Sequence, residues 1–161
     1  MLASNERGFF PYTPATTLLY GLEEAIGMLH EEGLDAVFAR HERLAGACRR
    51  AAAAWGLEIQ CGDPASHSPV LTGVRVPEGC NADQVRSVIL QHFNMSLGAG
   101  LGKVAGKVFR IGHLGDTNSL TILGALAGVE MGLELSGVPH GKGGVQAAMA
   151  YLAEAARGVP A

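Results

Sequence analysis

The chain has 161 residues, of which 48% are hydrophobic and 17% are charged, and its formal net charge is −3. This length provides for one modest core, and the lack of a basic stripe argues against nucleic acid as a partner. No apolar run approaches the roughly 18 residues that span a bilayer, and residues 1–12 lack the order of a signal peptide. We therefore expect a soluble, cytoplasmic protein that has no membrane partner.

The cysteines and histidines give no sign of a metal site. The cysteines are widely spaced and odd in number, which is typical of reduced thiols in a cytosolic protein. The histidines fall on scattered elements without the spacing of metal ligands, so we predict no metal site. The cysteines are Cys48, Cys61 and Cys80.

Two helices are predicted in the first third of the chain. The first begins at Thr16 or Thr17, carries apolar residues at the spacing of one helix face, and ends at Gly33. The second follows from Leu34 and ends at Gly56. Four arginines lie off its apolar stripe, and we interpret them as a solvated face. These are Arg40, Arg43, Arg49 and Arg50.

After the second helix the hydrophobic period changes to two, which predicts strands at 57–61 and 69–76. Asn81 is predicted to cap a helix, with Gln84 in the capping-box position. A short strand within 94–100 then leads into a glycine-rich loop, and the next strand covers residues 107–113.

Thr117 or Asn118 is predicted to cap a long helix that is largely buried, and a short amphipathic helix follows the break at 139–144. This order of elements predicts an α+β fold, with a small, mostly antiparallel sheet and helices packed mainly on one face.

The loop at 98–107, "GAGLGKVAGK", superficially resembles a phosphate-binding loop. It lacks the G-K-[ST] of a Walker A sequence, and its glycines do not form G-x-G-x-x-G at the start of a helix. We therefore interpret it as a flexible or close-packed connection.

Arg110 stands alone as a charge in the strand of "GKVFRIGHLG". Side chains alternate across a strand, so Phe109 and Ile111 share one face and Arg110 projects from the other. A guanidinium there can hold a carboxylate with two parallel hydrogen bonds. The alternative is an arginine that is paired with a nearby acid or exposed on an uncovered face. Spacing alone leaves both possibilities open.

His113 and Asp116 lie three residues apart and could form a general base with its orienting carboxylate. No motif places a nucleophile beside them, so a capping and turn-forming pair before the long helix is the preferred interpretation.

Several segments resemble serine–glyoxylate aminotransferases, which are class V pyridoxal-phosphate-dependent enzymes. The resemblance covers essentially the whole chain and corresponds to the C-terminal portion of that family. It is carried by "FFPYTPATTLLYGLEEAI", "SPVLTGVRVPEG", "NMSLGAGLGKVAGKVFRIGHLGD" and "LGALAGVEMGLELSGVP".

The resemblance implies the small C-terminal domain of a fold-type I homodimer that acts on amino acids and 2-oxo acids such as glyoxylate. Arg110 stands where the family binds the substrate carboxylate. Thr13 stands where the family contacts the phosphate of pyridoxal phosphate in the partner subunit. Phe9 and Phe10 occupy positions where a family tyrosine would assist, and Tyr12 is a doubtful substitute.

The family's Schiff-base lysine lies in the large domain, and none of Lys103, Lys107 and Lys142 matches its motif. We therefore expect no catalytic residue in this chain and no transamination by the chain alone. We divide it into a cofactor-contacting interdomain segment at 1–16, the small domain at 17–138, and a C-terminal tail with a short helix at 139–161. Two alternatives stay open: a non-catalytic amino-acid-binding module, and a subunit that completes a separately encoded large domain.

Overall fold

The computed structural model describes residues 5–158. The chain divides into two compact units, residues 1–37 and residues 38–161. They are described separately, and the second contains the sheet and the candidate site.

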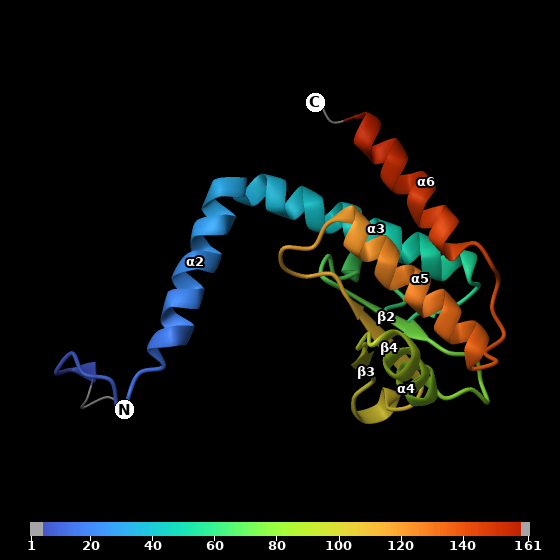
Figure 1. Ribbon diagram of the computed structural model, residues 1–161, viewed down its shortest axis with the longest axis horizontal. Helices are drawn as coiled ribbons and strands as arrows, with labels where there is room; N and C mark the ends of the chain where they lie inside the picture. The colour runs from blue at the N-terminus through green and yellow to red at the C-terminus, as the bar shows by residue number, and fades with distance from the viewer. Residues whose placement is uncertain (1–4, 159–161) are drawn as a thin grey trace. The chain divides into compact units, whose positions relative to one another are not determined.

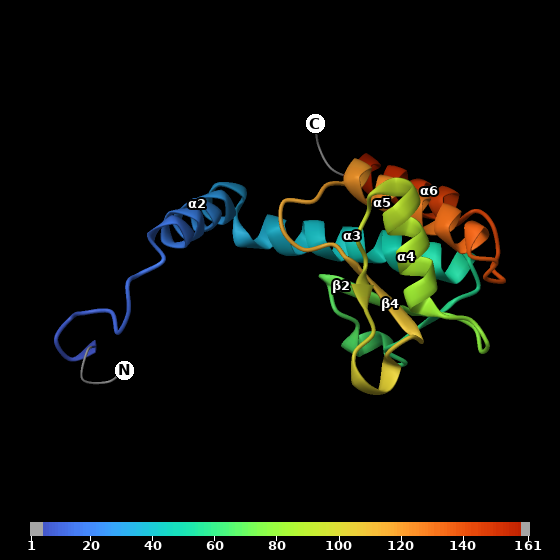
Figure 2. The same cartoon turned by 60° about the horizontal axis from the view of Figure 1, so that its bottom comes forward.

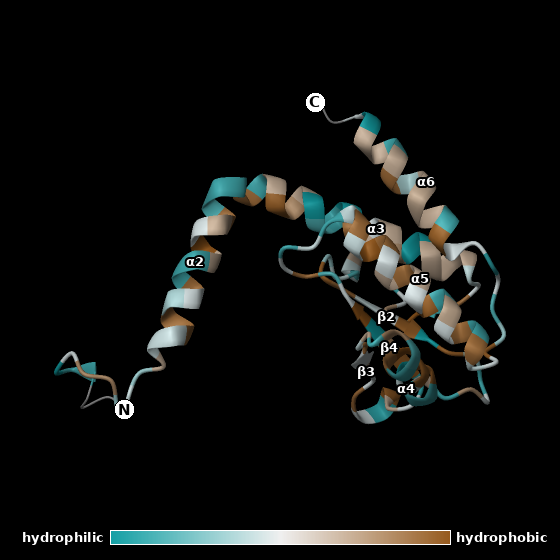
Figure 3. Ribbon diagram, viewed as in Figure 1, coloured by the Kyte–Doolittle hydropathy of each residue, from teal (hydrophilic) through white to brown (hydrophobic). Residues whose placement is uncertain are grey.

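The first unit is dominated by one amphipathic helix, α2 (Thr16–Glu32). Gly33 ends it with a φ of 83°, a conformation that favours glycine, and donates its N–H to the carbonyl of Leu29. The predicted helix and its end are thus confirmed. No residue of α2 is buried, although Leu18, Tyr20 and several other large apolar side chains lie along it. Figure 3 shows hydrophobic and hydrophilic residues alternating along this helix.

The second unit contains a four-stranded, fully antiparallel sheet in the order β1-β2-β4-β3. The predicted antiparallel arrangement is confirmed, although each strand is shorter than its period-two pattern. The strands are β1 (Glu58–Ile59), β2 (Leu71–Arg75), β3 (Gly98–Ala99) and β4 (Val108–Gly112).

Helices cover one face of this sheet, as predicted (Figures 1 and 2). Asn81 and Asn118 cap two of them, because their side chains accept hydrogen bonds from the N–H groups of Asp83 at 2.8 Å and Thr121 at 3.0 Å. The helices are α3 (Leu34–Ala54, of which residues 38–54 belong to this unit), α4 (Ala82–Phe93), α5 (Ser119–Leu135) and α6 (Gly144–Arg157). Two short 3₁₀ helices, η1 (Pro64–Ser66) and η2 (Gly102–Val104), lie in the connections.

The core lies between the sheet and these helices. Val74, Phe109 and Ile111 enter it from the two central strands, and Trp55 from the end of α3 closes one side. The long helix α5 contributes six buried residues, whereas its Leu120 remains 79% exposed. The prediction that α5 is largely buried is therefore correct only for the face that meets the core.

Two of the arginines interpreted as a solvated face have specific structural roles. Arg40 Nη1 donates to the carbonyls of Gly115 at 2.7 Å and Thr117 at 3.1 Å, which ties α3 to the loop after β4. Arg50 lies 3.8 Å from the ring centroid of Tyr151 on α6, a cation–π contact. The solvated-face interpretation is wrong for Arg40, because a helical pattern does not show which later segment covers that face, whereas Arg50 is exposed as predicted and also contacts Tyr151.

Glu130 on α5 fixes the start of α6. Its carboxylate accepts hydrogen bonds from the indole N–H of Trp55 at 3.0 Å and from the N–H groups of Gly143 at 2.9 Å and Val145 at 3.0 Å. Partial burial opposes ionisation, but these three donors outweigh it and hold the pKa of Glu130 below its usual value. The carboxylate is therefore an ionised anchor for the last helix.

The glycine-rich loop at 98–107 is tightly packed where it leaves β3. A Cβ at Gly100 would overlap the carbonyl oxygens of Val104 and Val108. Because backbone atoms cannot yield as a flexible side chain can, this position requires glycine. In residues 5–158 no helix is long and apolar enough to cross a membrane.

Candidate functional site

Arg110 projects from the face of the sheet that the helices leave open. Its strand neighbours Phe109 and Ile111 are 0% and 1% exposed and belong to the core. Strand alternation therefore directs Arg110 to the opposite face, as the period-two pattern predicted. The guanidinium is half-buried there and does not lie against the helices.

Glycines flank Arg110 on both neighbouring strands. In the antiparallel register, Gly73 of β2 and Gly98 of β3 are the residues directly opposite Arg110. Paired residues of antiparallel strands point to the same face, so no side chain stands beside Arg110 on either neighbouring strand. On this part of the open face, the backbone of β2 and β3 on either side of Arg110 is therefore not covered by a side chain at the paired positions.

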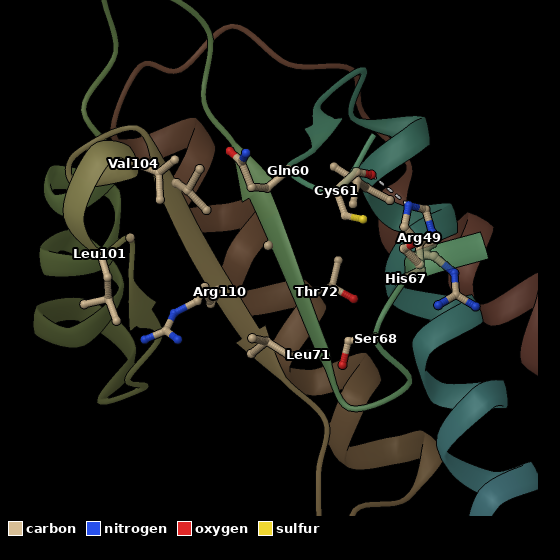
Figure 4. Close-up of a pocket in the computed structure, with 15 residues that line it drawn as sticks. Arg49, Gln60, Cys61, His67, Ser68, Leu71, Thr72, Leu101, Val104 and Arg110 are labelled. Carbon is tan, nitrogen blue, oxygen red and sulfur yellow. Dashed lines mark hydrogen bonds between the residues drawn. The ribbon is translucent and has the colours of Figure 1, made fainter. Parts of the chain in front are cut away.

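A pocket of about 320 Å³ opens on this face (Figure 4). Leu101 and Val104 of the η2 segment and Leu71 of β2 form apolar parts of its wall, and Arg110 provides a positive charge. The opposite end is polar and is formed by the connection between β1 and β2. There the His67 Nε2–H donates to the carbonyl of Cys61 at 2.9 Å, and Ser68 lies nearby.

The guanidinium of Arg110 has unused hydrogen-bonding capacity. Its Nε is buried without a hydrogen-bond partner, and within residues 5–158 it makes no ion pair. The two terminal nitrogens of the guanidinium make no hydrogen bond within residues 5–158 either, and they can bind a carboxylate through two parallel hydrogen bonds. The alternative of an arginine paired with a nearby acid is not what the structure shows. The geometry suits an anionic guest in the pocket.

His113 is not available as a general base. It is 0% exposed, its Nδ1–H donates to the carbonyl of Pro69 at 3.1 Å, and its Nε2 accepts from the hydroxyl of Thr72 at 2.9 Å. Burial is the main cause that lowers the pKa of His113 to about 4, so the ring is neutral at neutral pH. Asp116 is exposed and is not its partner, so neither the catalytic pair nor the turn-forming pair describes these residues.

Thr13 lies in an irregular, exposed segment before α2. The aromatic residues near it are also exposed, with Phe9 at 70%, Phe10 at 64% and Tyr12 at 81%. Thr13 and Arg110 belong to different units of the chain. The surroundings of Thr13 are therefore those of the first unit alone, and the surroundings of Arg110 are those of the second.

The pocket residues do not fit pyridoxal phosphate as a whole. Among the described residues that line the pocket there is no lysine to bind the cofactor as a Schiff base and no acid to pair with a pyridinium nitrogen. Lys142, for example, forms an ion pair with Glu134 at 3.4 Å. The geometry of the pocket suits an anion, and none of its described lining residues supplies a group for chemistry on the cofactor.

The chain is similar to known aminotransferases in sequence and in structure. The chain is 50% identical to the serine–glyoxylate aminotransferase of Methylorubrum extorquens over 151 residues, which are 93% of this chain and 38% of that protein. It is 49% identical to the serine–glyoxylate aminotransferase of Arabidopsis thaliana over 145 residues, or 89% of this chain and 36% of that protein. The resemblance to serine–glyoxylate aminotransferases is confirmed. The chain spans little more than a third of the length of these relatives, and no family model matches it.

Solved structures confirm the fold expected from the serine–glyoxylate aminotransferase resemblance. The ureidoglycine–glyoxylate aminotransferase of Bacillus subtilis aligns with a TM-score of 0.84 and 33% identity over 93% of this chain and 40% of that one. The pyridoxamine–pyruvate aminotransferase of Mesorhizobium loti aligns with a TM-score of 0.84 and 31% identity over 91% of this chain and 38% of that one. The α+β fold matches the small C-terminal domain of fold-type I aminotransferases.

The sequence did not predict several pocket residues of this serine–glyoxylate aminotransferase-like chain. Gly73 and Gly98 flank Arg110 only because β2 and β3 pair with β4 in one particular register. His67 and Ser68 reach the pocket through the irregular connection after β1. Strand alternation was enough to predict where Arg110 projects, but no local pattern identifies partners on other strands.

Proposed function

We propose that this chain is the small C-terminal domain of a pyridoxal-phosphate-dependent aminotransferase of the serine–glyoxylate type. In this proposal Arg110 binds the carboxylate of an amino acid such as serine, and then that of a 2-oxo acid such as glyoxylate. Arg110 supports it most directly, because its half-buried guanidinium lies on an open sheet face without an acid beside it. The names and identities of the relatives support the substrate class.

The contribution of Arg110 is to orient the substrate. Two hydrogen bonds from a planar guanidinium fix both the position and the plane of a carboxylate. The Cα atom next to that carboxylate is then held at one place, which lowers the entropic cost of a reaction there. Residues outside these 161 supply the lysine that carries the cofactor, so the chain alone does not transaminate.

The enzyme is a homodimer that works in the cytoplasm, and residues 1–16 connect the small domain to the cofactor-binding part. Thr13 of one subunit contacts the cofactor phosphate bound in the other subunit, and residues 139–161 form the C-terminal tail of the small domain. The exposed apolar side chains of α2 support a role in contact with further protein.

Complementation tests the role of Arg110. We would co-express the chain with the large-domain portion of the Methylorubrum extorquens enzyme and measure Michaelis constants for serine and glyoxylate. Arg110→Lys removes the bidentate grip and is expected to weaken both substrates by about 1.5–3 kcal/mol, the scale of a hydrogen bond to a charged group. The control is Arg86→Lys on α4, whose Nη1 forms an ion pair with Asp83 at 2.7 Å and which does not line the pocket. Unchanged Michaelis constants for Arg110→Lys would disprove the assignment.

The same complemented enzyme tests Thr13. Thr13→Ala removes a hydroxyl donor from the proposed phosphate contact and is expected to weaken cofactor retention, measured by absorbance titration. Equal retention by the variant and the parent would show that Thr13 has another role. If the lone chain binds serine and complementation recovers no transaminase activity, the chain is an amino-acid-binding module instead.

A further inference from the structure

Gly98 has no backbone reason to be glycine. It lies in the short strand β3, and its φ is outside the left-handed region that favours glycine. Glycine weakens the interior of a strand because it gains no side-chain packing and loses more conformational freedom on folding. A glycine in an ordinary strand therefore indicates that another group comes close to the backbone at that point.

The group that comes close is the side chain of Arg110. A Cβ added at Gly98 would lie 3.1 Å from the Cβ and 3.1 Å from the Nε of Arg110, and 3.5 Å from its Cζ. The first two distances are shorter than ordinary van der Waals contacts, so the arginine would have to shift by a few tenths of an ångström. The side chain of Arg110 thus lies across the bare backbone of β3, and Figure 4 shows it extending from β4 toward Leu101.

The glycine on the other side of Arg110 does not have this relation to it. A Cβ at Gly73 would meet Gln60 Cβ at 3.3 Å and Val108 Cγ1 at 3.6 Å, but no atom of Arg110. The two flanking glycines are therefore not equivalent. The arginine leans toward β3, and of the two flanking glycines only Gly98 lies where a Cβ would contact its side chain.

This placement also determines which nitrogens of Arg110 can bind a ligand. Nε is buried and has no partner, whereas the two terminal nitrogens are neither buried nor hydrogen-bonded to any part of the chain between residues 5 and 158. A carboxylate that enters the pocket can therefore be held end-on, by Nη1 and Nη2, but not side-on through Nε.

We propose that Gly98 is a positioning residue of the carboxylate site, which holds Arg110 across β3 so that its terminal nitrogens meet the substrate end-on. The inference rests on the proposed role of Arg110. It adds a specific requirement: any side chain at position 98 tilts the guanidinium away from its ligand without damaging the fold.

The first experiment measures carboxylate binding by the full chain. L-serine and acetate would be titrated into ¹⁵N-labelled protein, and dissociation constants obtained from chemical-shift changes. Gly98→Ala is expected to raise both dissociation constants about 3- to 10-fold and Gly98→Val further, because a shift of a few tenths of an ångström spoils the geometry of both hydrogen bonds to the carboxylate, and hydrogen bonds to a charged group contribute strongly to binding. Urea denaturation of both variants should show stability unchanged or increased, since alanine and valine suit a strand better than glycine.

The matched control is Gly124→Ala on α5. A Cβ at that position meets nothing within 4 Å, and glycine-to-alanine replacement in a helix also favours stability. This variant should gain stability and keep the parent dissociation constants. A merely structural role of Gly98 would make the Gly98 variants behave in the same way.

The second experiment needs no ligand. In the parent chain, the buried Nε–H of Arg110 should exchange with solvent at least about 10-fold more slowly than that of the exposed Arg7, and Gly98→Ala should accelerate it. Fast exchange of this proton in the parent would overturn the proposal.

The results distinguish a failure of the proposed role of Gly98 from a failure of the proposed role of Arg110. If Arg110→Lys weakens binding but both Gly98 variants stay within twofold of the parent, then Gly98 is not a positioning residue and the proposed function stands. If Arg110→Lys leaves binding unchanged, the proposed function fails, and the positioning role of Gly98 fails with it.

Discussion

The two faces of the sheet are formed by the same strands, but one packs in the core and the other lines a pocket. On the helix-covered face, Val74, Phe109 and Ile111 are almost completely buried and belong to the hydrophobic core. On the open face, Arg110 lies between Phe109 and Ile111 in sequence and Gly73 directly precedes Val74, and they contribute a charge and a bare backbone to a pocket. Residues one position apart on a strand can thus serve stability on one side and binding on the other.

Substitutions on the two faces should therefore have different effects. A change on the covered face removes packing and lowers the free energy of unfolding. A change on the open face alters what the pocket can hold and leaves the fold nearly unaffected. Three predictions test this separation, each by a measurement of stability.

Phe109→Ala should give the largest effect. Phe109 is 0% exposed at the centre of the covered face, so the variant leaves a cavity that neighbouring side chains fill only in part. The free energy of unfolding should fall by about 3–5 kcal/mol, as is typical of such truncations. Urea denaturation followed by circular dichroism measures it. A loss below about 1 kcal/mol would show that the covered face does not carry the stability.

His113 should make stability depend on pH at the polar end of the covered face. Its pKa is lowered in the folded state to about 4, so the unfolded chain binds the proton more readily. Stability is complete above the unfolded pKa of about 6.5, and it falls as the pH drops toward the folded pKa. The expected loss between pH 7 and pH 4 from this group is about 2–3 kcal/mol.

The pH prediction is measured as a difference, because carboxylates also titrate in this range. Urea denaturation at pH 7 and pH 4 would be compared for the parent and for His113→Gln, which keeps polar atoms but does not titrate. The variant should lose less stability over the interval. An identical loss in both proteins would contradict the burial of a neutral ring.

Arg110→Met should give the smallest effect on stability. The replacement keeps a long side chain on the open face and removes a buried Nε that has no partner. The free energy of unfolding should therefore stay within about 1 kcal/mol of the parent or increase, since an unsatisfied buried donor costs about that much. Thermal or urea denaturation measures it. A strongly destabilised variant would assign Arg110 to the fold and not to a ligand.

The sequence predicted much of this division. Period-two alternation was sufficient to predict that Arg110 points away from the core. Asn81 and Asn118 predicted the starts of two helices, because asparagine is a favoured N-cap residue. These signals depend only on neighbouring residues, so they can be recognised in a single sequence. The overlong strand predictions have a similar cause, since the alternating pattern continues beyond the residues that pair.

The remaining features depend on contacts between distant segments. Gly98 lies beside Arg110 only because β3 pairs with β4. His113 is buried where it forms hydrogen bonds with Thr72 and Pro69 of a distant segment. Arg40 looked like a surface residue until the loop at 115–117 provided carbonyls for it. The sequence next to each of these residues does not show whether its side chain contacts a distant segment or solvent.

The Glu130 anchor has a consequence for shortening the chain. Its carboxylate joins the indole of Trp55 to the first N–H groups of α6, and Ala148 and Leu152 of that helix are part of the core. A truncation before Gly143 would remove two of the three donors and uncover apolar surface on α5. Any minimal version of this protein designed for crystallisation or spectroscopy should therefore retain the chain through Arg157.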